Sequence, residues 1–317
     1  MNNFDFYNPT RIAFGEGKIA ALDTLVPADA KVLILFGGDS ARRTGTLSEV
    51  EAALGNRQVQ LFGGIEPNPS FETLMEAVTI VQRDGIDYLL AVGGGSVIDG
   101  TKFVAAASVF DGDAWDILLK GGTNIHRALP FGSVLTLPAT GSEMNKGAVV
   151  TRKSLQAKLP FHSEHVFPQF SVLDPTKSFT LPPRQVANGV VDAFVHIVEQ
   201  YLTYPASAPV QDRFAEGLLQ TLIDIGPQAL SDPENYSVRA DLMWVATLAL
   251  NGLIGAGVPQ DWATHMLGHE LTALHGLDHA QTLAIVLPAM LTERKDAKHG
   301  KLVQYAQRVW SIHEGSE

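Results

Sequence analysis

Short apolar runs alternate with amphipathic segments through the first half of the chain. Continuous apolar runs at 31–36 and 88–92 predict two buried strands, and the amphipathic segment at 73–84 predicts a helix between them. A further apolar run at 135–138 predicts another strand. Because such alternation is typical of parallel α/β units, we expect a parallel sheet with helices packed against it.

The second half of the chain has a different pattern, because strand signals end near residue 180. Amphipathic and apolar helical periodicities dominate from that point onward. They predict four helices, at 183–201, 211–225, 237–253 and 261–274. The change divides the chain into a predicted α/β domain at 1–180 and a predicted all-α domain at 181–317.

Glycine-rich turns follow two of the predicted strands. Gly93-Gly94-Gly95-Ser96 comes after one strand and opens a helix, and Gly37-Gly38-Asp39-Ser40 comes after another. Without β-carbons, backbone N–H groups can approach an anion at a helix N-terminus, where the helix dipole favours negative charge. A glycine turn alone often serves only to reverse the chain. Two such loops at the carboxyl ends of strands favour a bound dinucleotide.

Four histidines lie within fifteen residues of the predicted helical half: His265, His269, His275 and His279. Imidazole is the commonest protein ligand for borderline divalent metals, so this density indicates a metal site, although a single histidine on a helix is more often structural. Residues four apart share a helix face, which pairs His265 with His269. The same spacing pairs His275 with His279. Gly276 predicts a helix end, a turn and a new helix, which would let His265 and His279 meet at one ion.

Asp192 and His196 form a second candidate pair within the predicted helix at 183–201. They are four residues apart in an otherwise apolar segment, where an ionised aspartate would be costly unless it were neutralised. A hydrogen-bonded Asp–His pair in the core is the alternative. Metal binding is favoured once the histidine-rich segment is considered, because a carboxylate oxygen commonly complements imidazole nitrogen at such sites.

Composition narrows the classes of function. The 317-residue chain has no cysteine, which excludes disulfides, thiolate metal ligands and thiol nucleophiles. Its formal net charge of −11 argues against nucleic acid or an anionic membrane as the main partner. The first residues lack the basic and apolar segments of a signal peptide, and no apolar run is long enough for a bilayer. We therefore expect a cytoplasmic protein.

Together these motifs resemble the iron-containing, or group III metal-dependent, alcohol dehydrogenase family, and most strongly its branch of NADPH-dependent aldehyde reductases and butanol dehydrogenases. Each motif is weak alone, but their order and spacing are specific, and they cover essentially the whole chain. The sequence motifs are P-T-R-I-A-F-G at 9–15, G-I-E-P-N-P at 64–69, G-G-G-S-V-I-D-G-T-K at 93–102, T-L-P-A-T-G-S-E at 136–143, and the two histidine-bearing segments.

The resemblance implies a fold and an assembly. The fold is an N-terminal Rossmann-like dinucleotide-binding α/β domain and an all-α, metal-binding C-terminal domain, an architecture shared with dehydroquinate synthase, with the active site in the cleft between them. Relatives usually continue for several more helices, so this chain is expected to be shorter at its C-terminus. The resemblance also implies a homodimer.

The resemblance further assigns roles to individual residues. The implied metal ligands are Asp192, His196, His265 and His279. His269 is implied to lie near the nicotinamide as a catalytic residue for proton relay or substrate orientation, whereas His275 is left as structural. The implied cofactor contacts are Gly38, Asp39, Ser40, Gly94, Gly95, Ser96, Asp99, Thr136, Thr140 and Lys158. Asp99 has a simpler alternative role, in which it complements the dipole of its own helix.

The activity implied is reversible hydride transfer between NAD(P)H and a small aldehyde or primary alcohol, with a divalent ion, Fe(II) or Zn(II), as Lewis acid. NADP is the expected cofactor. Asp39 stands where the aldehyde-reductase branch commonly has glycine, and a carboxylate near the adenosine ribose favours NAD. Arg42 and Arg43 follow closely and would offset that charge.

Two other functions are compatible with these motifs. A lyase or cyclase similar to dehydroquinate synthase would also use nucleotide and metal, but it would need basic side chains to bind a phosphorylated acid, and the segments around the histidines are poor in them. A non-enzymatic protein that binds nucleotide or metal is the second alternative. Aldehyde-dependent consumption of NADPH or NADH distinguishes these possibilities.

Overall fold

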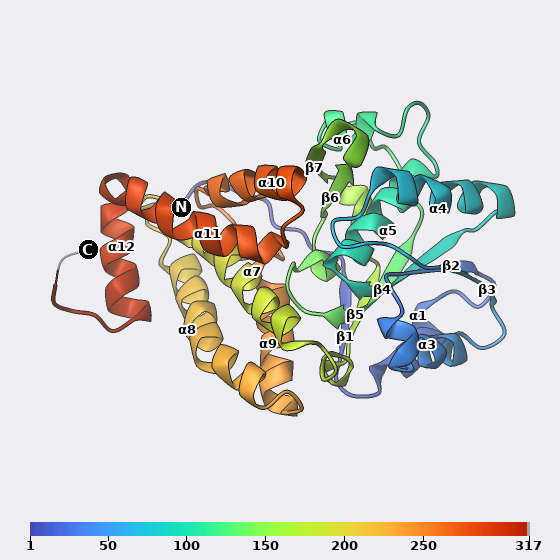
Figure 1. Ribbon diagram of the computed structural model, residues 1–317, viewed down its shortest axis with the longest axis horizontal. Helices are drawn as coiled ribbons and strands as arrows, with labels where there is room; N and C mark the ends of the chain where they lie inside the picture. The colour runs from blue at the N-terminus through green and yellow to red at the C-terminus, as the bar shows by residue number, and fades with distance from the viewer. Residues whose placement is uncertain (316–317) are drawn as a thin grey trace. The chain divides into compact units, whose positions relative to one another are not determined.

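The chain forms two compact units, each with its own buried core (Figure 1). The structure is a computed structural model and describes residues 1–315. One unit comprises Pro9–Pro138 and Ser142–Thr180 and is called the α/β unit below. The other comprises Met1–Asn8, Ala139–Gly141 and the chain from Leu181 onward, and is called the helical unit.

A six-stranded sheet of order β1-β8-β5-β4-β2-β3 forms the centre of the α/β unit, and all of its neighbouring strands are parallel. The strands are β1 (Arg11–Phe14), β2 (Lys31–Phe36), β3 (Gln58–Phe62), β4 (Tyr88–Gly94), β5 (Phe131–Leu137) and β8 (Phe170–Leu173). On β2, Val32 and Ile34 pack with helices on one face, while Leu33 and Leu35 are equally buried on the other. Burial on both faces explains the continuous apolar run, because a covered parallel sheet needs no polar face.

Helices and a small hairpin complete the α/β unit. The helices are α1 (Leu22–Leu25), α2 (Ser40–Arg43), α3 (Thr46–Leu54), α4 (Phe71–Asp84), α5 (Gly95–Ala107) and α6 (Asp116–Leu119). The Ser70 hydroxyl accepts a hydrogen bond from the Thr73 backbone N–H and so caps α4, which ends at Gly85 in the left-handed region. The antiparallel strands β6 (Gly147–Arg152) and β7 (Ala157–His162) form the hairpin.

Short 3₁₀ turns link these elements: η1 (Lys18–Ala21), η2 (Ser142–Met144), η3 (Lys153–Leu155), η4 (Glu164–Val166) and η5 (Pro175–Ser178). The important connection for the site is between β4 and α5. The strand ends at Gly94 and the helix begins at Gly95, so the glycine run is the turn itself.

The described part of the helical unit contains only helices and connecting loops. The helices are α7 (Pro183–Tyr201), α8 (Pro209–Ser231), α9 (Tyr236–Ala249), α10 (Ala263–His275), α11 (His279–Glu293) and α12 (Lys295–Val309). In Figure 1, α7 and α8 run side by side, and α10 and α11 form a helical hairpin. The core between α7, α8 and α9 is apolar and includes Ile197, Leu219 and Leu242. This packing stabilises α7, the helix that carries Asp192 and His196.

The predicted fold class, an α/β part followed by an all-α part, is confirmed. The helix predicted at 183–201 has those bounds in the structure, whereas the helix predicted at 237–253 stops at Ala249. The backbone leaves the helical conformation at Leu250, and Gly252 follows in the turn with a positive φ of 93°. Among the described residues, no helix is both long enough and apolar enough to cross a bilayer.

Candidate metal centre and cofactor-binding residues

Asp192 and His196 lie on consecutive turns of α7, within the core of the helical unit. Their side chains are almost completely buried. The Asp192 Oδ1 atom lies 3.6 Å from the His196 Nε2 atom, slightly beyond hydrogen-bonding distance. The packing of α7 therefore places a carboxylate oxygen and an imidazole nitrogen next to each other without joining them directly.

The α10–α11 hairpin brings two further imidazoles to the same carboxylate. Helix α10 ends at His275, Gly276 follows in the left-handed region with φ of 68°, and α11 begins at His279. The distance from Asp192 Oδ1 is 3.8 Å to His265 Nε2 and 3.7 Å to His279 Nε2. The predicted helix–turn–helix is confirmed.

The distances around Asp192 are close to the edges of a metal coordination sphere and slightly longer than them. Three imidazole nitrogens lie 3.6–3.8 Å from one carboxylate oxygen. In a tetrahedral site with bonds of about 2.0–2.2 Å, ligand atoms are separated from one another by roughly 3.3–3.6 Å. Ligand atoms of Asp192, His265 and His279 all lie within 4.8 Å of one another. His196 adjoins this group through Asp192, and its ring stacks on His265 at 4.6 Å.

Buried polar atoms in the cluster indicate the same chemistry. Asp192 Oδ1 and His265 Nε2 are buried and have no hydrogen-bond partner within the described chain. Such atoms cost free energy unless a partner satisfies them, and most buried polar groups in proteins are satisfied. Carboxylate oxygen with imidazole nitrogen is a donor set that suits Zn(II), Fe(II) and related divalent ions. The residues present therefore fit a divalent metal ion.

The pKa values place Asp192 and His196 in the protonation states that a metal requires, whereas His265 would have to release a proton. Burial alone would raise the pKa of Asp192, but His196 and the other neighbouring imidazoles lower it below its usual range. Burial lowers the pKa of His196 to about 4, so that this ring is neutral at pH 7. For His265, burial acts to lower the pKa, but interactions with Asp192 and Glu199 outweigh it and raise the pKa to about 8. Metal binding requires an ionised carboxylate and displaces protons from imidazole nitrogens.

The remaining two histidines of the segment differ from each other. His269 is buried on α10, with its ring centroid 5.2 Å from that of His279 and 6.4 Å from that of His265. His275 is exposed at the last residue of α10. The expectation that His275 and His279 share a helix face is wrong, because the helix ends between them.

Glu199 is a member of this cluster that the sequence analysis did not identify. It lies on α7 with 4% of its surface exposed, and its carboxylate contacts the Nδ1 atom of His265. Asp192, His196 and Glu199 follow the spacing i, i+4, i+7, which places all three on one helix face. That spacing is the feature of the sequence that could have identified Glu199 as a member of the cluster. Trp262 packs edge-on against His196 and His265, with centroid distances of 6.1 and 5.3 Å.

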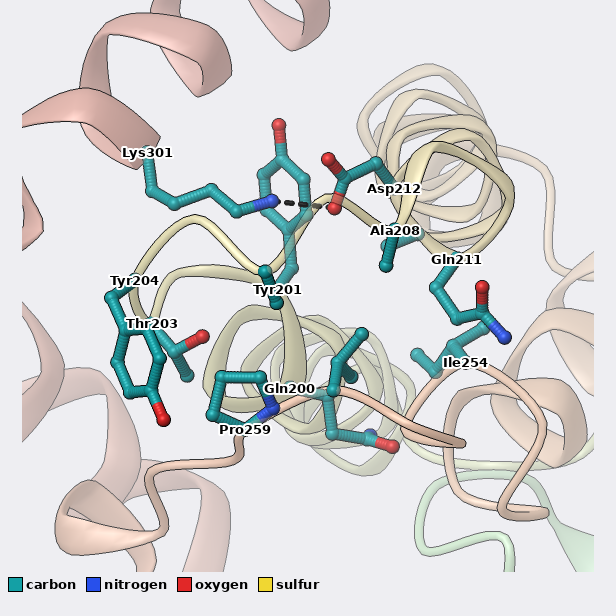
Figure 2. Close-up of a pocket in the computed structure, with 13 residues that line it drawn as sticks. Gln200, Tyr201, Thr203, Tyr204, Ala208, Gln211, Asp212, Ile254, Pro259 and Lys301 are labelled. Atoms are coloured by element: carbon teal, nitrogen blue, oxygen red, sulfur yellow. Dashed lines mark hydrogen bonds and ion pairs between the residues drawn. The ribbon is translucent and has the colours of Figure 1, made fainter. Parts of the chain in front are cut away.

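A separate pocket of the helical unit is lined by Tyr201, Asp212, Ile254 and Lys301 among others (Figure 2). Its main polar contact joins Lys301 Nζ to Asp212 Oδ1 at 2.5 Å. None of the four predicted metal ligands lines this pocket. Lys301 also lies over the Tyr201 ring at 4.4 Å, so the contacts in this pocket join α12 to α7 and α8.

In the α/β unit, the glycine turn after β4 is shaped by close packing. The pairing of β4 with β5 shifts register between Gly93 and Gly94. A β-carbon on Gly93 would lie 2.6 Å from Val97, and one on Gly94 would lie 3.0 Å from the Leu137 side chain. Glycine is therefore required sterically at position 93 and favoured at position 94, and Gly95 opens α5 with backbone N–H groups at the helix N-terminus.

Ser96 and Lys158 of the predicted cofactor contacts meet at one residue. The Asn68 backbone N–H donates to Ser96 Oγ at 3.3 Å, and Lys158 Nζ donates to Asn68 Oδ1 at 2.9 Å. Asn68 belongs to the G-I-E-P-N-P motif and has φ of 54°, a left-handed conformation that asparagine tolerates. A lysine ammonium is thus held beside the N-terminus of α5, where both groups favour an anion.

Asp99 has protein partners for both carboxylate oxygens. Ser142 Oγ donates to Oδ1 at 2.6 Å, and the Val149 N–H donates to Oδ2 at 2.9 Å. Burial raises the pKa of Asp99, although the nearby Lys102 ammonium acts against this shift. These contacts favour a structural role within the α/β unit.

The other predicted cofactor residues are less constrained by their surroundings. Gly38 and Asp39 are exposed between β2 and α2, and Ser40 is exposed as the first residue of α2. The Arg42 guanidinium lies 5.3 Å from the centre of the Phe36 ring. Thr136 lies near the carboxyl end of β5. Thr140 belongs to the helical unit, unlike the other nine predicted cofactor contacts.

Comparisons with known proteins place the chain among metal-dependent dehydrogenases. The NADPH-dependent aldehyde reductase YqhD of Escherichia coli is 64% identical over 319 residues, which cover 100% of this chain and 82% of that protein. A probable NADH-dependent butanol dehydrogenase 1 of Bacillus subtilis is 42% identical, with the same coverage of both chains. The crystal structure of E. coli YqhD superposes with a TM-score of 0.99 and covers 99% of this chain and 81% of that one.

Family models agree with these relatives along the chain. The model described as iron-containing alcohol dehydrogenase matches residues 9–175, and the model of the C-terminal part of the Fe-containing alcohol dehydrogenase family matches residues 186–317. The predicted resemblance is confirmed. On the strength of the matched domains and of a relative at 64% identity, the chain belongs to the iron-containing alcohol dehydrogenase family.

Proposed function

We propose that the protein reduces small aldehydes to primary alcohols with NADPH, reversibly, and that a divalent metal ion bound in the helical unit is required. Membership of the family makes the chain an aldehyde and alcohol oxidoreductase. The observation that carries the metal proposal is the convergence of three imidazole Nε2 atoms on Asp192 Oδ1. The proposed ligands are Asp192, His196, His265 and His279.

The ligand set has consequences for charge. When bound, a divalent ion supplies Lewis acidity, which polarises a carbonyl for hydride addition and lowers the pKa of an alcohol for oxidation. Asp192 contributes one negative charge and three neutral imidazoles contribute none, so the ion and its ligands keep a net charge of about +1. Asp192, His196 and His265 are buried, which excludes water from these three donors and strengthens their electrostatic effect, whereas His279 is partly exposed.

His269 is proposed as the residue that relays a proton or orients the substrate. Its burial on the same helix as His265, with its ring 5.2 Å from His279, supports this role. An imidazole can exchange a proton near neutral pH, which suits the protonation of an alkoxide product. His269→Ala is expected to lower turnover and alter its pH profile without loss of metal. Unchanged turnover and pH profile would remove the residue from the mechanism.

NADPH is proposed as the preferred cofactor, bound through the glycine turns, Ser96 and Lys158. The relative at 64% identity is named NADPH-dependent, whereas the Bacillus relative at 42% is named NADH-dependent. Asp39 opposes a 2′-phosphate by its charge. Arg42 and Arg43 bring two positive charges within four residues of it, and this net positive balance supports NADP.

Iron(II) and zinc(II) both suit the proposed ligand set, and elemental analysis of protein purified without added metal distinguishes them. The homodimer and the cytoplasmic location remain predictions.

The test of the proposed function is aldehyde-dependent oxidation of NADPH, followed by absorbance with a panel of short aldehydes. Metal-loaded protein is expected to consume NADPH, and protein treated with a chelator is expected to lose this activity and regain it when metal is restored. The family match already disfavours the lyase or cyclase alternative. Absence of NADPH and NADH consumption by metal-loaded protein would contradict the proposal.

A further inference from the structure

Glu199 is a buried glutamate whose side-chain hydrogen bonds within the described chain all go to the beginning of α10. Its Oε1 atom accepts hydrogen bonds from the backbone N–H groups of Thr264, at 2.6 Å, and His265, at 3.4 Å. Its Oε2 atom contacts His265 Nδ1. No lysine or arginine pairs with this carboxylate within the described chain. Burial of a carboxylate is costly, so these contacts with α10 must supply the compensation.

The contact with Nδ1 determines which nitrogen of His265 carries a proton. An ionised carboxylate only accepts hydrogen bonds, so Nδ1 must be the donor. In the neutral ring the lone pair then resides on Nε2. That atom is buried, lies 3.8 Å from Asp192 Oδ1, and has no hydrogen-bond partner among the described residues. Glu199 therefore leaves the ligating atom of His265 free on the side that faces Asp192.

Resting on the proposed metal function, we propose that Glu199 is a positioning residue that fixes His265 in the metal-binding tautomer and orientation. Carboxylates that accept the second N–H of a ligating histidine raise its basicity and hold its ring. Here the same carboxylate also holds the His265 backbone, since Oε1 binds two of the free N–H groups at the N-terminus of α10. Ring and backbone of one ligand are thus tied to α7, the helix that carries Asp192.

His196, the other proposed imidazole ligand on α7 and α10, has no such contact in the described chain. His196 Nδ1 is buried and has no hydrogen-bond partner within the described chain. Glu199, which lies on α7, thus supports His265 of α10 but not His196 of its own helix. Loss of Glu199 should act on metal affinity through His265 alone.

Glu199→Gln separates the two functions of the carboxylate. The amide oxygen can still accept from the N–H groups of Thr264 and His265, which keeps the helix cap. The amide nitrogen then faces His265 Nδ1 and donates to it, which moves the ring proton to Nε2 and blocks ligation. We expect Zn(II) affinity, measured by competition with a chromogenic chelator, to fall by about 10- to 100-fold. Glu199→Asp keeps a carboxylate and should recover part of this loss.

Glu216→Gln is the matched control. Glu216 is another buried glutamate of the helical unit, on α8, and it contacts Tyr201, Arg213 and Arg308 rather than a histidine. Its replacement removes a buried carboxylate and should destabilise the fold, but the Zn(II) affinity of the folded protein should stay at the wild-type value.

Proton-coupled ¹⁵N spectra of histidine add a readout that a structural role alone would not change. In metal-free wild-type protein, at a pH at which the ring is neutral, the His265 signal, identified by its loss in metal-free His265→Ala, should show the proton on Nδ1. This spectrum requires no Glu199 variant, so it tests the proposal even if Glu199→Gln fails to fold. A His265 ring protonated on Nε2 would overturn the proposal.

The affinity measurements distinguish failure of the proposed metal function from failure of the proposed role of Glu199. If wild-type protein binds no Zn(II), the proposed metal function fails and this inference fails with it. If wild-type protein binds Zn(II) and folded Glu199→Gln binds it equally well, only the positioning role of Glu199 is overturned. Reduced affinity in Glu199→Gln, partial recovery in Glu199→Asp and no change in Glu216→Gln are the results expected.

Discussion

Each unit of the molecule buries a cluster of charged side chains, and the two clusters differ in how fully the protein satisfies them. In the α/β unit, the completely buried Lys102 donates from Nζ to Ser142 Oγ, Asn145 Oδ1 and the Gly147 carbonyl, at 2.9, 2.9 and 2.7 Å. Each of the three N–H groups of the Lys102 ammonium therefore has an acceptor. Asp99 nearby accepts through both of its oxygens.

In the helical unit, the cluster around Asp192 is not fully hydrogen-bonded within the described chain. Asp192 Oδ1 and His265 Nε2 find no hydrogen-bond partner in the described chain, and the distances around them are those between ligands rather than between donors and acceptors. Burial of such groups persists in a protein when something else binds them. The comparison shows that buried charge alone does not identify a site: Lys102 Nζ and both Asp99 oxygens have hydrogen-bond partners in the protein, whereas we propose that a cation binds Asp192 Oδ1 and His265 Nε2.

The largest expected effect is the loss of bound metal when a residue of the Asp192 cluster is replaced. Asp192→Ala or His265→Ala should reduce bound metal to background, because each change removes a ligand from a closely spaced set. Elemental analysis after loading and gel filtration measures this effect. NADPH binding, followed by fluorescence, should persist in both variants. Wild-type metal content in either variant would contradict the ligand assignment.

Lys102→Met should have the opposite effect: it should lower the stability of the fold and leave the metal content unchanged. The change removes one member of a satisfied buried cluster and leaves Asp99 without its nearby cation, so the free energy of unfolding of the α/β unit should fall by about 3–5 kcal/mol. Denaturant titration measures the loss. Metal content of the folded variant should equal that of the wild type, and a loss of metal would break the distinction between the two clusters.

Metal itself should stabilise the helical unit. At a free Zn(II) concentration one hundred times the Kd, mass action adds about 2.7 kcal/mol to the free energy of unfolding. Thermal denaturation with and without Zn(II) should therefore show a higher Tm with metal for wild-type protein and for Lys102→Met. Asp192→Ala serves as the control and should show no such increase.

The pH dependence of stability should reveal the buried lysine. Burial lowers the pKa of Lys102 to about 8, against 10.5 as its ordinary value, while Asp99 and Glu143 act in the opposite direction. Between these two pH values the unfolded chain binds more protons than the folded chain, so this group makes stability rise with pH, by at most about 1.4 kcal/mol per pH unit. The difference in unfolding free energy between wild type and Lys102→Met should grow from pH 8 to pH 10.5. A difference that shrinks would contradict this sign.

The smallest effect concerns cofactor choice. Asp39 is exposed, so Asp39→Asn should raise the affinity for NADPH relative to NADH by about 1 kcal/mol or less, since exposed charge pairs are weak. Binding titrations with both nucleotides measure the ratio. A shift toward NADH would show that Asp39 does not oppose the 2′-phosphate.

The parts of the fold that are buried on both sides were predictable from the sequence. The run that forms β2 is continuous and apolar, and its predicted bounds are those observed. Strand β3 at the edge of the sheet was not predicted, because its sequence, Q-V-Q-L-F, is mostly exposed and mixes polar with apolar residues. The β6–β7 hairpin was missed for a similar reason, since its two strands pair mainly with each other.

The candidate site was predictable where its residues are close in sequence. Spacing paired Asp192 with His196, and Gly276 indicated the turn that separates α10 from α11. The role of Glu199 was not predictable, because it depends on N–H groups 65 and 66 residues later in the chain. A buried glutamate and a surface glutamate look alike in a sequence.

X-ray absorption fine structure of the Zn(II)-loaded protein tests the central claim most directly, because it reports the ligands of the bound ion. The spectrum should fit nitrogen and oxygen ligands at about 2.0–2.2 Å, with the multiple scattering of three imidazoles. In His265→Ala the zinc signal should fall to background, because this change removes a ligand of the ion. A shell of oxygen atoms without imidazole scattering would place the ion elsewhere and contradict the account.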